Sequence, residues 1–162
     1  MIKMKRWMIA FITLLLCFLS GCSEPLPLEP VSVQQVEKNY QITVSSVGRS
    51  YRRRDLKSAQ LTLTVEYTGE GEREVSGSSD FFTYYLCDDA GVPLEDSGIN
   101  DEQYFFTFSA DHPYELSWDC GDHFKKIGPG IYQIKFWGGF RETADPQRSV
   151  EIDLTLPLEI LK

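Results

Sequence analysis

The sequence predicts an all-β fold, an antiparallel β-sandwich of about seven to eight strands in a single domain. The 162 residues include 10 Phe, 8 Tyr and 3 Trp, and aromatic side chains favour strands. Several short runs after residue 40 alternate apolar and polar residues with a period of two. No stretch after residue 20 shows the sustained apolar period of an amphipathic helix.

The clearest expected strand covers residues 61–67, where Leu61, Leu63, Val65 and Tyr67 alternate with polar residues. Successive side chains of a strand point to opposite faces, so this run has one apolar face. Clusters of Asp, Gly and Pro separate the runs and favour turns. The expected strands are 40–44, 61–67, 81–87, 104–108, 114–118, 132–136 and 150–156.

The first 21 residues have the pattern of a targeting leader. Lys3, Lys5 and Arg6 form a basic start, and residues 7–19 carry no charge. Thirteen residues of helix would cover about 20 Å, which is less than the hydrocarbon core of roughly 30 Å. We therefore expect the leader to be removed, not to remain as a membrane span.

Leu19-Ser20-Gly21-Cys22 resembles the lipobox of bacterial lipoproteins. The resemblance implies that the Cys22 thiol receives a diacylglyceryl group and that the chain is cut before Cys22. Several acyl chains hold a protein stably on a membrane, whereas one does so only marginally. The expected partner is thus the membrane, through covalent lipid on Cys22, and the expected location is the outer face of the cell membrane.

We expect three parts along the chain: a leader at 1–21, a lipidated Cys and extended tether at 22–35, and the sandwich at 36–162. Prolines at 25, 27 and 30 disfavour helix and strand pairing. A proline-rich segment of this kind is a semi-stiff spacer.

Charge is unevenly distributed along the chain. Loss of the leader removes three of 16 Lys and Arg and none of the 24 acids, which leaves a net charge of −11. Such a chain repels nucleic acid and anionic phospholipid, so no nucleic-acid partner is expected. One segment is nevertheless basic, and its guanidinium groups suit phosphate or carboxylate groups of an envelope protein, wall polymer or lipid headgroup. The residues of this expected anionic-partner loop are Arg49, Arg52, Arg53, Arg54 and Lys57; the alternative is a solvated loop.

Cysteine usage leaves two thiols in the mature domain. Cys17 leaves with the leader and Cys22 takes lipid, so Cys87 and Cys120 remain. An exported domain permits a disulfide between them, which would stabilise the fold by roughly 3 to 4 kcal/mol. Strand alternation allows an alternative, in which the Cys87 and Cys120 side chains point to different faces of their strands and remain free thiols.

No set of residues predicts a metal site, a cofactor or catalysis. Cys120 and His123 have C-x-x-H spacing, but a structural zinc ion needs four ligands and His112 is the only other histidine. The acidic stretch lacks the ligand order of a calcium loop; its candidate ligands are Asp88, Asp89, Glu95, Asp96, Asp101 and Glu102. No Ser or Cys has a recognisable nucleophile context. We therefore expect no enzyme, with carboxylate-only catalysis in the envelope as the alternative.

The segments "FFTYYLCDDAG", "YELSWDC" and "GPGIYQIKF", within residues 59–137, resemble bacterial immunoglobulin-like domains of envelope lipoproteins. The resemblance implies an immunoglobulin-like sandwich with a non-catalytic binding or scaffolding role. It also implies that Tyr132 forms a tyrosine corner, which ties a loop to its strand. Unlike antibody domains, this chain has no Cys in 61–67 or 132–136. A similar late strand occurs in BsuPI-type proteinase inhibitors, so an inhibitor-like domain is an alternative.

Overall fold

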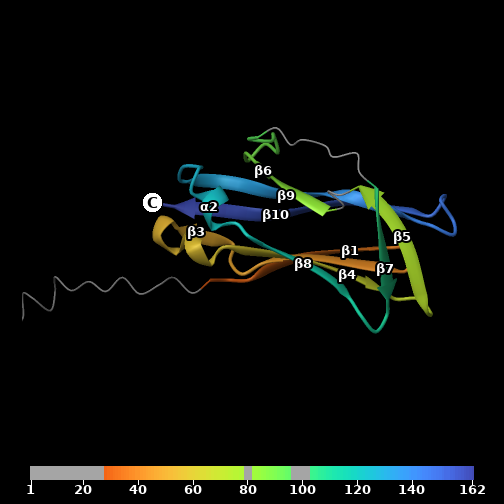
Figure 1. The fold of residues 1–162 in the computed structure, drawn as a ribbon. Coiled ribbons are helices and arrows are strands. Elements are labelled where there is room, and N and C mark those ends of the chain that lie inside the picture. Colours follow the sequence, from red (N-terminus) through yellow and green to blue (C-terminus); the bar gives the residue numbers. More distant parts are fainter. Residues whose placement is uncertain (1–27, 79–81, 96–102) are drawn as a thin grey trace, which may run out of the picture.

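A computed structural model describes residues 28–78, 82–95 and 103–162 and shows two β-sheets packed face to face (Figure 1). The prediction of an all-β sandwich is confirmed. The strands are β1 (Val31–Glu37), β2 (Tyr40–Ser46), β3 (Ser50–Arg52), β4 (Gln60–Tyr67), β5 (Glu72–Ser78), β6 (Phe82–Cys87), β7 (Gln103–Ser109), β8 (Tyr114–Asp119), β9 (Gly130–Glu142) and β10 (Ser149–Leu161). Two short helices, η1 (Arg53–Ser58) and α2 (Gly121–Phe124), lie at one end.

The strands divide between a four-stranded sheet, β1-β2-β4-β8, and a six-stranded sheet, β3-β10-β9-β5-β7, in which β6 also pairs with β9. All pairs are antiparallel except β3 with β10. The chain passes from one sheet to the other between β2 and β3, at Gly48. A Cβ at Gly48 would lie 2.9 Å from the end of the Leu28 side chain, which would have to shift to admit it.

The core lies between the sheets and uses the predicted alternation. Residues 61, 63, 65 and 67 of β4 are buried while the residues between them are partly exposed. From the six-stranded sheet, Phe140 meets Tyr40 and Phe108 with ring centroids 4.8 and 5.3 Å apart, in edge-to-face geometry. Such pairs add about 0.5 to 1.5 kcal/mol beyond the burial of apolar area.

The described residues form ten strands instead of the predicted seven to eight, because β1, β3 and β5 have weak sequence patterns. The β5 sequence EREVSGS is mostly polar, yet β5 pairs with both β7 and β9. The sandwich also begins earlier than predicted. Val31–Glu37 pairs along its length with β2, and Leu28 packs against the core, so the predicted tether boundary at residue 35 is corrected to before Leu28. The first residue of the predicted strand 81–87 lies outside the described residues.

Tyr132 stands near the start of β9, where the tyrosine corner was expected. Its hydroxyl donates a hydrogen bond to the Gly128 carbonyl oxygen at 3.1 Å. This bond joins the strand to the backbone four residues upstream, which is the geometry that a tyrosine corner requires.

The predicted disulfide is corrected by the structure, in which Cys87 and Cys120 are buried free thiols. Leu86 belongs to the core between the sheets, and its neighbour Cys87 therefore points to the opposite face of β6. Cys120 follows β8 and belongs to the core. The two thiols lie on different sides of the six-stranded sheet, so alternation forbids their pairing.

Candidate functional site

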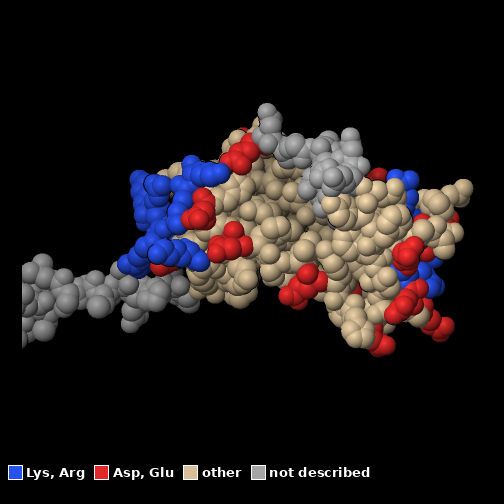
Figure 2. Space-filling model, in the orientation of Figure 1, with Lys and Arg blue, Asp and Glu red and all other residues tan. Residues whose placement is uncertain are grey.

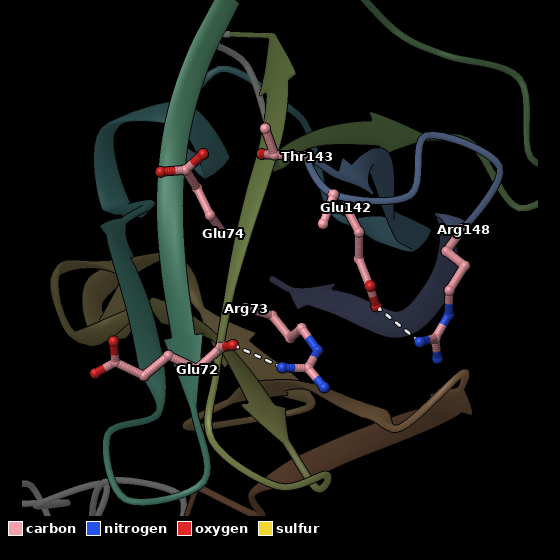
Figure 3. Close-up of a pocket in the computed structure, with 7 residues that line it drawn as sticks. Glu72, Arg73, Glu74, Glu142, Thr143 and Arg148 are labelled. Atoms are coloured by element: carbon pink, nitrogen blue, oxygen red, sulfur yellow. Dashed lines mark hydrogen bonds and ion pairs between the residues drawn. The ribbon is translucent and has the colours of Figure 1, made fainter.

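The described surface is hollowed where β5 meets the end of β9 and the start of β10 (Figure 3). This cavity of about 500 Å³ is lined by Glu72, Arg73, Glu74, Glu142, Thr143, Ala144 and Arg148. The Thr143 amide donates to the Glu74 carbonyl oxygen at 2.9 Å, which closes β5 onto the end of β9. Charged groups of both signs thus face one small space.

Glu142 is the buried carboxylate of this cavity, with only 3% of its surface exposed. The Tyr40 hydroxyl donates to Oε1 at 3.1 Å, and Nη1 of Arg148 lies 3.5 Å from the same oxygen. The backbone fixes the pair as well, since the Glu142 amide donates to the Arg148 carbonyl oxygen at 3.0 Å. Burial, and then the Glu142 charge, raise the pKa of Tyr40, so its phenol stays a donor.

Arg73 forms the other wall of the cavity. Its guanidinium lies 5.2 Å from the centre of the Tyr67 ring and donates to the Glu72 carbonyl oxygen at 2.8 Å. Figure 3 shows Arg73, Glu142 and Arg148 directed toward the same space. Two guanidinium groups beside one carboxylate can hold a small polar ligand by charge-assisted hydrogen bonds.

A second polar cluster joins β6, α2 and the loop after β6 through His123. The Tyr84 hydroxyl lies 3.0 Å from Nδ1 of His123, and Nε2 lies 3.0 Å from Oε2 of Glu95. Burial, and then Cys120, raise the pKa of Tyr84, so its phenol stays protonated within this cluster. Cys120 and His123 thus both contact Tyr84. In the described ranges no three groups converge as metal ligands.

The acidic stretch of the sequence divides between a turn and residues that are not described. Oδ1 of Asp88 accepts the amides of Ala90 and Val92 at 3.0 and 2.8 Å, so this carboxylate stabilises the turn after β6. Three candidate calcium ligands, Asp96, Asp101 and Glu102, lie outside the described residues.

The predicted basic loop lies at the opposite end from the cavity and gains a second segment there. Residues 49–58 contain Arg49, β3 and η1, while α2 and the residues after it add Lys125 and Lys126. Nη2 of Arg53 donates to the Lys125 carbonyl oxygen at 3.2 Å, which joins the segments. Figure 2 shows Lys and Arg gathered at this end, where Figure 1 places β3 and α2. We call this surface the basic end; its residues are Arg49, Arg52, Arg53, Arg54, Lys57, Lys125 and Lys126.

The acids of these two segments are paired within them. Asp55 lies 3.6 Å from Nε of Arg54. Asp122 pairs with Lys125, and this hydrogen bond and charge, with a further contribution from Lys57, lower the Asp122 pKa. The influence of Lys57 on Asp122 shows that charges of η1 and α2 act on one another.

Gly121 allows η1 and α2 to approach this closely. A Cβ at Gly121 would lie 2.6 Å from the Leu56 carbonyl oxygen. We expect Gly121→Ala to lower the free energy of unfolding by about 1 to 3 kcal/mol, because backbone must move. Gly128→Ala is the matched control, since its Cβ would meet nothing within 4 Å. Urea unfolding of both variants checks the prediction, and equal stability would contradict it.

Several residues of these sites have no motif in the sequence. Glu142 continues the inward series of β9 after Phe136 and Phe140, so a charged residue at an inward position was the available signal. Arg73 and Arg148 had no comparable signal in the sequence. Glu95 was a candidate only as a calcium ligand, and the structure places it beside His123. Cys22 lies outside the described residues.

Comparisons with known proteins add little to this geometry. No family model and no curated protein matches the chain. A Bordetella pertussis protein provisionally named ApaA is similar in structure, with 10% identity, a TM-score of 0.32, and coverage of 86% of this chain and 99% of that chain. A structural-genomics target gives 10% identity, a TM-score of 0.29, and coverage of 82% and 84%. Likenesses this low carry no argument about function.

Proposed function

We propose that this chain is a lipid-anchored lipoprotein of the bacterial cell envelope whose single immunoglobulin-like domain has a non-catalytic binding or scaffolding role. The observation that carries the proposal is the order of a basic start, an uncharged run and Leu19-Ser20-Gly21-Cys22 directly before the folded domain. Leu28 already packs on the core, six residues after Cys22. An anchor and a domain thus follow one another with a short connection.

Two features of the fold support an immunoglobulin-like domain. The chain changes sheets between β2 and β3, and β3 then pairs parallel to the last strand, β10. The hydroxyl of Tyr132 returns to the Gly128 carbonyl oxygen before the penultimate strand. Greek-key sandwiches present loops at both ends, where binding surfaces commonly form.

The two ends of the sandwich offer different surfaces for binding. One end carries the charged cavity around Glu142, and the other carries the basic end. No helix in the described part of the chain is long and apolar enough to cross a membrane.

The test is Cys22→Ala in the full-length chain, expressed in bacteria with an alkyne fatty-acid label. The normal chain is expected to take the label and to enter the detergent phase after Triton X-114 separation. Cys22→Ala is expected to take no label and to keep its leader, because the acceptor thiol is gone. Cys17→Ala is the matched control and is expected to be labelled normally. Cleavage and labelling of Cys22→Ala as in the normal chain would show that the anchor is assigned wrongly.

A further inference from the structure

The basic end is also the end at which the described chain begins. The Arg49 amide donates to the Glu29 carbonyl oxygen at 3.0 Å, and Leu28 packs beside Gly48 and Tyr51. β1 then runs away from this end, since Val31 pairs with Ser46, the last residue of β2. The chain therefore leaves the domain beside Arg49, in the direction of Cys22.

We infer that the basic end faces the membrane that holds the Cys22 lipid and binds the phosphate groups of anionic phospholipids there. The inference rests on the proposed function for the position of the anchor. It adds to that proposal a ligand class and an orientation of the domain, with the Glu142 cavity directed away from the membrane.

Covalent geometry limits how far the basic end can move from the anchor. Six residues separate Cys22 from Leu28, and a fully extended chain spans at most about 3.6 Å per residue, or about 22 Å in total. A tether this short keeps the basic end at a high effective concentration, of the order of millimolar, near the headgroups. Weak individual contacts are therefore sufficient for binding.

The charge distribution favours the same orientation. Five acids lie at the basic end, Glu29, Asp55, Asp119, Asp122 and Glu159, and Lys162 follows β10 there, so this end has a net charge of +3. The rest of the mature chain contains five Lys and Arg and 19 acids, a net charge of −14. An anionic surface attracts the basic end and repels the rest of the domain, within a screening length of about 8 Å at physiological salt.

The guanidinium and ammonium groups are placed for several headgroups rather than one pocket. Arg53 and Arg54 are exposed on η1, and Lys125 and Lys126 are exposed after α2. Arg side chains bind phosphate through two parallel hydrogen bonds, and Lys side chains bind it as point charges. Each such residue near an anionic bilayer strengthens binding about fivefold.

The test uses residues 28–162, which contain every strand and helix that the structure describes and the core between the two sheets. Binding is measured by co-sedimentation with vesicles of phosphatidylcholine alone or mixed with phosphatidylglycerol. We expect binding to the mixed vesicles only, weakened as salt rises to about 0.15 M. Arg52/Arg53/Arg54→Ala and Lys125/Lys126→Ala are each expected to lower the partition coefficient by at least about tenfold.

The matched control is Lys135/Arg141→Ala, which removes two positive charges from β9, away from the basic end. We expect this variant to bind as the unchanged domain does, and thermal unfolding verifies that all variants are folded. No binding to mixed vesicles at low salt, or equal loss in the control, overturns the inference. Binding to soluble polyphosphate without binding to vesicles also overturns it and assigns the basic end to an anionic polymer. Because these measurements do not use Cys22, they succeed or fail independently of the labelling experiment.

Discussion

Raising the pH from about 9 to about 11 is expected to destabilise the sandwich, because buried phenols and thiols must stay protonated in it. Tyr40, Tyr51 and Cys120 have no exposed surface. Burial is the main cause that raises the pKa of Tyr40 and Tyr51 above 10.0 and of Cys120 above 9.0. Each group ionises in the unfolded chain at a pH at which the folded chain still binds the proton.

The sign of the effect follows from proton counts. Above these unfolded-state pKa values the unfolded chain binds fewer protons than the folded one, so stability falls as pH rises. Such a group removes about 1.4 kcal/mol of stability per pH unit between its unfolded-state and its folded-state pKa. Domains are stable by about 5 to 15 kcal/mol in total. The contribution of these groups is fully present below pH 9.

Urea unfolding between about pH 7 and pH 11 measures this loss. Tyr51→Phe removes one titrating group, so the decline in stability of this variant above pH 10 is expected to be shallower than that of the normal chain. An unchanged urea midpoint up to about pH 11 in the normal chain would falsify the prediction.

Arg148→Ala is expected to destabilise the domain by about 2 to 3 kcal/mol, because it leaves the Glu142 carboxylate buried with fewer partners. The Glu142 side chain is 4% exposed and that of Arg148 is 37% exposed. Water screens the arginine, so the cost falls below the 3 to 5 kcal/mol of a fully buried pair. Arg148 also donates to the Lys38 carbonyl oxygen at 3.4 Å, and this bond is lost too.

Arg141→Ala is the matched control for this substitution. Arg141 is exposed on the same strand as Glu142, and its loss is expected to change stability by less than about 0.5 kcal/mol. Glu142→Gln in the Arg148→Ala background is expected to recover part of the loss, because no buried charge remains. Chemical unfolding of the normal chain, Arg148→Ala, Glu142→Gln and the double variant gives the coupling energy between the two residues. Equal stability of Arg148→Ala and Arg141→Ala contradicts the prediction.

The sequence predicted the strands that have one buried face and missed those that do not. Residues 61–67 alternate regularly because one side of β4 meets the core. β5 has two buried residues among polar ones, and its position depends on hydrogen bonds to β7 and β9. Backbone pairing of this kind has no residue preference strong enough to recognise in a single sequence.

The candidate sites divide in the same way. The run of Arg52, Arg53 and Arg54 is visible in the sequence as local positive charge. Its contact with Lys125 depends on the close packing of α2 against η1 at Gly121. The Glu142 cavity combines residues from β5, β9 and the loop between β9 and β10, and Tyr40 of β2 bonds to Glu142. Contacts between residues about a hundred positions apart leave no local pattern.

The sequence by itself determined the leader pattern, the all-β class and the basic loop, because each depends on the order of neighbouring residues. Tertiary structure alone decided that Cys87 and Cys120 stay apart, that Glu142 is buried beside Tyr40 and Arg148, and that the chain enters beside the basic end. These features depend on which face of a strand meets which sheet. A shift of one residue in a strand reverses every side chain on it, so only the assembled sheets decide them.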